Sequence, residues 1–400
     1  MQTARHRGLV GSLLVGLAAL MLTGIEVQAA PFVPGADSEV LERLPEKTSP
    51  QLRQLKAMRA MVARDPNDLA QVAALARRYI EAARSEGDPR YLGYAEAVMK
   101  PWWKQPDGPT AALVLRATLR QSSHDFDAAL ADLDRVLRRE PRNAQARLTR
   151  ATVLTVQGRY AQARSDCEAL PGAAPQVYAT LCSAAIDSLT GKADEALRAL
   201  DAAMSARGVD AGARAWGQTL LGEIGQRRDD ASAEPRFREA LRGDPNDPYL
   251  VGAFSDWLLD HERPREVVTL IPADTRIDPL LLRRALALTM LRSDDAPAAV
   301  DALRARVLAS RARGDTVHQR EEARYALALN GDPAMALELA RRNFAVQREP
   351  ADVRVLAEAA LAARDAAGMR EVREWLANTG LQYAAVERML AAGAGGRAAR

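Results

Sequence analysis

Lysine, aromatic residues and cysteine are all scarce in this chain of 400 residues. Aromatic residues make up 4% of it, cysteine occurs twice, and 5 lysines stand beside 50 arginines. The 55 basic and 52 acidic residues nearly balance, so no strongly basic surface points to a nucleic-acid partner. A hydrophobic content of 48% excludes a disordered chain. Few aromatic residues and abundant alanine favour one long helical array over several mixed domains.

Sequence motifs of common catalytic centres are also missing. The chain has no phosphate-binding P-loop, no Gly-x-Ser-x-Gly and no His-Glu-x-x-His. From position 30 onwards its histidines are His124, His261 and His318, too widely separated in the sequence to indicate a zinc site. We therefore expect no catalytic residue, no metal site and no cofactor.

The N-terminal segment 1–29 is typical of a cleaved secretory signal. Arg5 and Arg7 precede an apolar run from Leu9 to Leu22, and Val27 and Ala29 place small side chains at a cleavage site. Because about 20 residues are needed to cross a bilayer, this run is too short for a membrane span, although a retained anchor is the alternative. No later segment is long and apolar enough to span a membrane. The predicted location is the periplasm of a Gram-negative bacterium.

Acidic-residue and proline pairs divide the remaining chain into segments. These pairs are Asp65-Pro66, Glu140-Pro141, Asp244-Pro245 and Glu349-Pro350, and each is followed within two residues by Asn or Asp. Such combinations end one helix and begin the next. Between them, apolar residues recur at helical spacing, and no two-residue alternation appears. The pattern predicts helices throughout and no strand.

The chain also repeats itself at a regular interval. A shift of 34 superposes 116–118 (Arg-Ala-Thr) on 150–152 (Arg-Ala-Thr), Phe126 on Tyr160, and Ala129 on Ala163. This pattern resembles the tetratricopeptide repeat, a helix-turn-helix unit of about 34 residues. The resemblance implies an all-α, right-handed superhelical solenoid of antiparallel helix pairs. Small or turn-forming residues are expected where paired helices touch: Ala76, Ala117, Ala129, Ala151, Gly158, Tyr160, Ala163, Gly191 and Ala196.

This repeat pattern sets the expected organisation of the chain. After the signal at 1–29, we expect a linker at 30–49, repeats at 50–272, degenerate repeats with a C-terminal cap at 273–388, and a flexible tail at 389–400.

Cys167 and Cys182 fall in adjacent helices on either side of a turn. Helical offsets allow either a disulfide or two buried free thiols.

The resemblance implies partner binding on the inner face of the superhelix. The expected groove residues are Arg77, Thr118, Gln121, Thr152 and Thr155. Neighbouring positions are apolar or carry hydroxyl groups, which predicts a groove for an extended peptide. They do not support the carboxylate clamp that some tetratricopeptide repeat proteins form with Lys and Asn.

Trp102 and Trp103 are expected in the core or, alternatively, in an exposed hot spot. Arg116 and Arg150 are expected on the surface, as a ladder or as solvated helix faces.

These observations predict a non-enzymatic scaffold that binds protein or peptide partners in envelope, secretion or uptake machinery. Self-association through the repeat ends is a second way in which such an array works. The alternative of another class is a peptidoglycan-active enzyme or its accessory subunit, because superhelices similar to this one occur in lytic transglycosylases. That family presents its general acid in a Glu-Ser pair, and this chain contains no Glu-Ser dipeptide.

Overall fold

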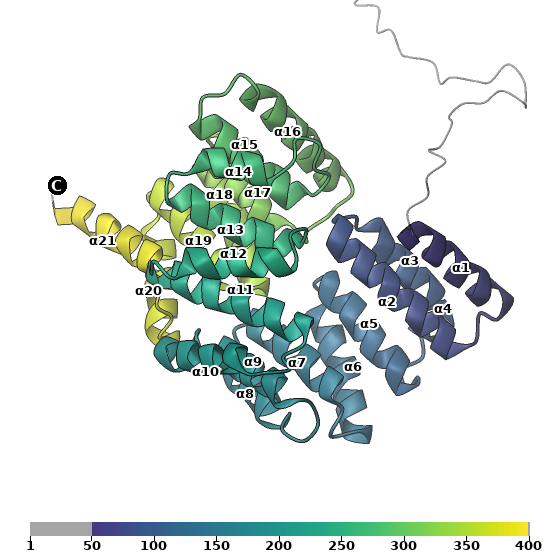
Figure 1. Ribbon diagram of the computed structural model, residues 1–400. Coiled ribbons are helices and arrows are strands. Elements are labelled where there is room, and N and C mark those ends of the chain that lie inside the picture. Colours follow the sequence, from purple (N-terminus) through teal and green to yellow (C-terminus); the bar gives the residue numbers. More distant parts are fainter. Residues whose placement is uncertain (1–49, 399–400) are drawn as a thin grey trace, which may run out of the picture. The chain divides into compact units, whose positions relative to one another are not determined.

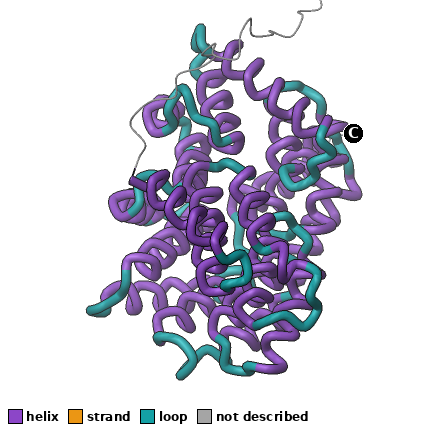
Figure 2. Tube along the Cα trace, turned by 90° about the vertical axis from the view of Figure 1, so that its right-hand side faces the viewer, coloured by secondary structure: helices purple, strands orange, loops and turns teal. Residues whose placement is uncertain are grey.

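The computed structural model describes residues 50–398 (Figure 1), and in that range it contains 21 helices and no strand (Figure 2). The expected signal and linker, 1–49, lie outside the described residues. The helices are α1 Pro50–Arg64, α2 Leu69–Glu86, α3 Arg90–Val98, α4 Lys100–Trp103, α5 Thr110–Ser122, α6 Phe126–Arg139, α7 Ala144–Val156, α8 Tyr160–Glu168, α9 Gln176–Asp187, α10 Ala193–Ser205, α11 Ala211–Arg228, α12 Ala233–Gly243, α13 Pro248–Asp260, α14 Pro264–Leu270, α15 Asp278–Met290, α16 Ala296–Ala312, α17 Gln319–Ala328, α18 Pro333–Val346, α19 Pro350–Ala362, α20 Ala366–Thr379 and α21 Ala384–Ala398.

Consecutive helices pack in pairs, from α5 with α6 to α19 with α20, and α2 pairs with α3. The first helix of each pair also packs on the first helix of the next pair, along the series α5, α7, α9, α11, α13, α15, α17 and α19. The first helices therefore form the inner layer of the array, and the second helices form its outer layer. The predicted all-α solenoid of helix pairs is confirmed.

Small residues let the paired helices approach closely. Ala76, Ala117, Ala129, Ala163 and Ala196 are fully buried, and Ala151 is 3% exposed. Alanine at a helix crossing lets two backbones come within about 8–10 Å of each other. Gly158 forms the turn between α7 and α8 with φ 73°, and His124 takes the equivalent turn one repeat earlier with φ 59°.

Arg116 and Arg150 were both expected on the surface, but Arg116 is buried and Arg150 is half-buried. Arg116 is 3% exposed, and its guanidinium donates to both carboxylate oxygens of Asp132 at 2.7 and 2.6 Å. Arg150 makes the same pair of bonds to Asp166, at 2.7 Å each. Both aspartates are fully buried and, like the arginines, occupy the same position in successive repeats. Each Arg–Asp pair therefore joins the two helices of one repeat.

A disulfide joins two successive repeats. Cys167 in α8 and Cys182 in α9 are bonded, with their Cα atoms 5.5 Å apart, and both side chains are buried. This separation is the ordinary one for bridged cysteines. The bridge fixes the second helix of one repeat to the first helix of the next.

The C-terminal repeats pack against the turns of the middle repeats. The Arg348 N–H donates to the Val156 carbonyl at 2.7 Å, and Gln347 Nε2 lies 3.0 Å from His124 Nδ1. Leu189, which follows α9, belongs to the same apolar core as α18, α19 and α20. Segments far apart in sequence thus meet, and within residues 54–398 the solenoid turns back on itself.

Helix α21 continues to Ala398, so the tail expected at 389–400 begins inside a helix. Alanine has the highest helix propensity of all residues, and α21 also packs on α19. A Cβ atom at Gly393 would lie 3.2 Å from the Met369 side chain, which places this turn of the helix against the molecule. Among the described helices, none is both long enough and apolar enough to cross a membrane.

Candidate functional site

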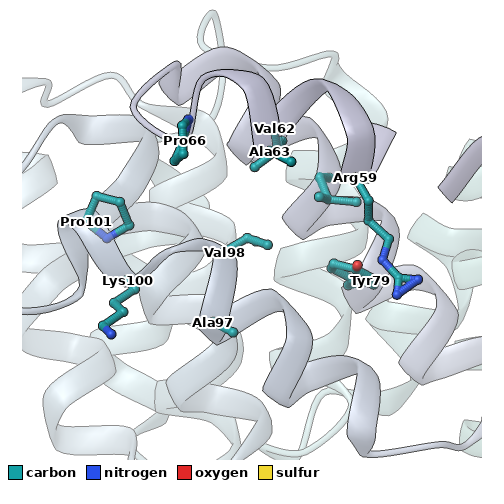
Figure 3. Close-up of a pocket in the computed structure, with 10 residues that line it drawn as sticks. Arg59, Val62, Ala63, Pro66, Tyr79, Ala97, Val98, Lys100 and Pro101 are labelled. Atoms are coloured by element: carbon teal, nitrogen blue, oxygen red, sulfur yellow. The ribbon is translucent and has the colours of Figure 1, made fainter. Parts of the chain in front are cut away.

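Two hollows in the described part of the chain are candidate binding sites. We call the first the N-terminal groove. It has a volume of about 700 Å³ and lies among α1, α2, α3 and α4. Figure 3 shows Arg59 beside Tyr79 on one side of it, Lys100 and Pro101 on the other, and Val98 between them. Its ten lining residues are Arg59, Val62, Ala63, Pro66, Leu75, Tyr79, Ala97, Val98, Lys100 and Pro101.

The N-terminal groove is apolar at its floor and charged at its edge. Val62, Leu75 and Tyr79 are buried, whereas Arg59 and Lys100 are exposed. Burial raises the pKa of the Tyr79 phenol, which keeps this ring neutral. The surface therefore offers apolar contacts flanked by two positive charges.

Three tyrosines form a cluster next to this groove. The ring centroids of Tyr79, Tyr91 and Tyr94 lie 5.7 to 6.1 Å apart in each pair, which is the usual range for aromatic pairs. Tyr94 is 47% exposed. Because its ring contacts Tyr79, which lines the groove, the groove continues into an exposed aromatic side chain.

The second hollow, which we call the central cavity, lies on the inner face of the solenoid. It has a volume of about 380 Å³ and is lined by the first helices α7, α9, α11, α13, α15, α17 and α19. Its charged residues are Glu223, Arg227, Asp256, Arg283, Arg320, Glu321, Arg324, Glu349 and Arg354, and its two tyrosines are Tyr249 and Tyr383. Tyr249 is 60% exposed, so solvent reaches the lining.

Most of the arginines in the central cavity are paired with carboxylates. Asp256 lies between Arg283, at 2.5 Å, and Arg324, at 2.9 Å. Burial would raise the pKa of Asp256, but these two guanidinium groups hold it at about 2. Arg354 on α19 forms two bonds of 2.6 Å to Asp260 on α13. The Arg283–Asp256 pair joins successive repeats, whereas the Arg324–Asp256 and Arg354–Asp260 pairs join α13 to α17 and to α19, across intervening repeats.

Arg320 is the most heavily paired of these arginines. Its guanidinium lies 3.2 Å from carboxylate oxygens of Glu321, Glu349 and Asp352. Burial raises the pKa of Glu349 and of Asp352. Asp352 also accepts a hydrogen bond from the Asn343 amide at 2.7 Å. This cluster fixes the start of α19 against α17.

Arg227 differs from the other four arginines. Its Nη2 donates to the Ser188 hydroxyl at 3.0 Å, and among the described residues no carboxylate lies within 4.0 Å of its guanidinium. Burial lowers the pKa of Arg227. The nearby Glu223 carboxylate accepts a hydrogen bond from the Tyr249 hydroxyl, and burial raises the pKa of Glu223.

Of the five expected groove residues, Thr155 lines the central cavity, and the other four do not. Arg77 and Thr152 are exposed, while Thr118 and Gln121 are half-buried. The Thr118 and Thr152 hydroxyls donate to carbonyls of their own helices. The lining of this cavity differs from the apolar and hydroxyl lining expected for the groove, because the return of the C-terminal repeats brings charged residues of α17 and α19 to it.

The tryptophans lie mostly in the core. Trp102 and Trp257 are buried, and Trp103, Trp216 and Trp375 are half-buried. The Arg120 guanidinium stacks over Trp103, 5.8 Å from the ring centroid.

Within 50–398, no group of three or more His, Cys, Asp or Glu side chains is arranged to hold a metal ion.

Comparisons with known proteins agree with the repeat pattern. Residues 114–178 match the family model described as tetratricopeptide repeat. No curated protein matches the chain. Similar solved structures include a tetratricopeptide repeat protein from Parabacteroides merdae, with 15% identity, 71% of this chain and 98% of that chain covered, and a TM-score of 0.35. A human IFIT1 dimer with m7Gppp-AAAA is 14% identical, with 86% of this chain and 78% of that chain covered and a TM-score of 0.38. Yeast Tom70 is 10% identical, with 82% of this chain and 88% of that chain covered and a TM-score of 0.29.

Proposed function

We propose that this chain, whose residues 114–178 match the tetratricopeptide repeat family model, is a non-catalytic scaffold that binds a protein or peptide partner in the periplasm. The N-terminal groove is the observation that carries this proposal. Its apolar floor, the exposed Tyr94 beside it, and the flanking Arg59 and Lys100 are features of a protein-binding surface.

Two observations support export. The segment 1–29 has the charge and apolar pattern of a secretory signal, and the Cys167–Cys182 disulfide is of a kind that persists in oxidising compartments such as the bacterial periplasm. Cell fractionation and the mass of the isolated protein test this part. We expect a periplasmic protein whose mature chain starts at Ala30; a cytoplasmic protein that retains residues 1–29 would contradict it.

The partner is tested with a photoreactive amino acid placed at Tyr94 in intact cells. We expect a covalent adduct with an envelope protein, and no adduct when the same group replaces Arg198, whose side chain on the outer helix α10 is 71% exposed. Val98→Glu should abolish the adduct because it places a charge in the groove. Gly93→Glu, on the same helix where a new side chain meets no neighbour within 4 Å, should leave the adduct unchanged.

The adduct also separates a foreign partner from self-association. Its mass identifies the trapped chain, and light scattering gives the oligomeric state of the purified protein. An adduct with a second copy of this chain would replace the scaffold proposal with self-association. Adducts of equal yield at positions 94 and 198 would contradict the groove as the binding surface.

A further inference from the structure

The central cavity has the size of a site for a small molecule. Its volume of about 380 Å³ lies at the lower end of the roughly 300–1,000 Å³ that is typical of small-molecule sites. Its lining combines the charged residues described above with seven aliphatic ones, Ala185, Leu189, Leu220, Ala253, Ile277, Ala351 and Val355. A short aliphatic molecule that carries one charged group would match both parts of this lining.

Among the described residues, Arg227 is the cationic group of this cavity that lacks a close counter-ion. The nearest carboxylates to Arg283, Arg320, Arg324 and Arg354 lie 2.5, 3.2, 2.9 and 2.6 Å away. Arg227 is 7% exposed, and its side-chain partner is the neutral Ser188 hydroxyl. Arginine stays protonated in proteins, and a buried charge is costly unless an anion compensates it.

The neighbours of Arg227 decide which anion fits. Glu223, Tyr383, Tyr249 and Tyr160 are the groups whose charge or hydroxyl acts most strongly on its guanidinium. Arg320 compensates Glu321 and Glu349, but Glu223 lines the same cavity and is bonded to the Tyr249 hydroxyl instead of an arginine. It would repel a multiply charged anion such as phosphate more than a monocarboxylate. A guanidinium pairs well with a planar carboxylate through two parallel hydrogen bonds.

We propose that the central cavity binds a short aliphatic monocarboxylate, whose carboxylate pairs with Arg227 beside Ser188 and whose chain lies against the aliphatic lining. This site is independent of the N-terminal groove. The ligand would contact Ser188 just after α9, Arg227 on α11 and Val355 on α19. Binding would therefore hold the C-terminal repeats to the middle ones and stabilise the closed solenoid.

Ligand-observed NMR and calorimetry with hexanoate as the probe test this site. We expect hexanoate to bind the wild-type protein, with hexanamide and inorganic phosphate at least tenfold weaker, because neither presents a single planar carboxylate. Equal binding of hexanamide and hexanoate, tighter binding of phosphate, or no binding of hexanoate to the folded protein would each overturn the proposal. All of these measurements use the wild-type protein, so the result does not depend on whether a variant folds.

Variants locate the binding group. Arg227→Gln should weaken hexanoate binding at least tenfold, and Ser188→Ala should weaken it less. Arg198→Gln removes an exposed arginine from α10 and should change nothing. Wild-type affinity in a folded Arg227→Gln protein would overturn the assignment.

A peptide end is the other source of a carboxylate, and an acetylated tripeptide acid tests it. Tighter binding of this peptide than of hexanoate would overturn the small-molecule assignment. Failure of the photo-crosslink at position 94 would leave the carboxylate site standing, and equal binding of acid and amide would leave the scaffold standing.

Discussion

His124 and Gly158 occupy the same turn in successive repeats, and each does two things. Both have a left-handed backbone, which the turn requires. Each also contacts the C-terminal repeats, His124 through Gln347 and Gly158 through Trp375, whose ring lies against its Cα. Two single residues therefore connect the local turn of a repeat to the closure of the solenoid.

Gly158→Ala should destabilise the protein by about 2–5 kcal/mol, since left-handed backbone costs a non-glycine residue about 1–2 kcal/mol and overpacking adds about 1–3 kcal/mol. The new Cβ would lie 2.5 Å from the Trp375 ring. Gly208→Ala is the matched control, because Gly208 has φ 78° and no neighbour within 4 Å, so the strain of about 1–2 kcal/mol remains alone. Urea unfolding followed by circular dichroism measures both, and equal losses would contradict the Trp375 contact.

His124 should make the stability depend on pH. Burial, together with His318 and Arg320, lowers the pKa of its imidazole to about 4, while Glu321 and Asp315 oppose this shift. The unfolded chain binds a proton near pH 6.5, so the contribution is complete above that pH and falls as the pH drops towards 4. The shift corresponds to no more than about 3 kcal/mol.

A substitution isolates this effect from other titrating groups. Burial raises the pKa of Glu349 and Asp352, and these carboxyl groups act in the opposite direction at low pH. His124→Asn retains a residue that accepts positive φ and removes the imidazole. The unfolding free energy of the wild type should fall more between pH 7.5 and 5 than that of His124→Asn; parallel pH profiles would contradict the account.

At the scale of the helices, the two Arg–Asp pairs each join the helices of one repeat, but they differ in what else they hold. Arg116 additionally donates to the carbonyls of Trp102, Trp103 and Gln105 at 2.6 to 3.0 Å. It thereby fixes the loop after α4 to α5. Arg150 has no such role and instead reaches the partly exposed Asp134.

This difference predicts unequal effects of the same substitution. Arg116→Met should cost about 2–4 kcal/mol. It removes a buried guanidinium that bonds Asp132 and the carbonyls of Trp102, Trp103 and Gln105, although Arg120 and Arg135 still pair with Asp132. Arg150→Met should cost about 1–3 kcal/mol, because its side chain is 25% exposed and Arg147 still pairs with Asp166. Chemical unfolding of the two variants makes the comparison, and an equal or larger loss for Arg150→Met would contradict it.

The helix pairs could be predicted from the sequence because each repeat is a local unit. Ala117, Ala129, Ala151 and Ala163 stand at fixed spacing, and fixed spacing determines which side chains meet within a pair. The Arg–Asp pairs were also marked in the sequence, since Asp132 and Asp166 repeat with the same period as the arginines. A surface position is nevertheless the expectation for those arginines, because the spacing of a residue within the repeat does not show which side chain of the neighbouring helix faces it.

At the scale of the whole solenoid, local spacing no longer decides the structure. Each repeat is rotated slightly against the last, and these rotations add up until residues of α18, α19 and α20 meet the turns after α7 and α9. The central cavity forms only because the solenoid closes in this way. The repeat pattern therefore could not predict Arg227 or the ion pairs around it. The function we infer for this cavity depends on that closure.

Cysteine trapping tests the closure most directly. A Cβ atom at Gly380 would lie 3.0 Å from the Gly191 Cα, so the two backbones nearly touch. Their Cα atoms are therefore at the short end of the roughly 4.4–6.8 Å that disulfides span. Gly191→Cys with Gly380→Cys should therefore form a disulfide under mild oxidation, seen by mass spectrometry of unreduced peptides. The control pair Gly191→Cys with Gly314→Cys, whose second site has no neighbour within 4 Å, should not. Trapping of the 191–380 pair no faster than the control would show an open solenoid and contradict the account.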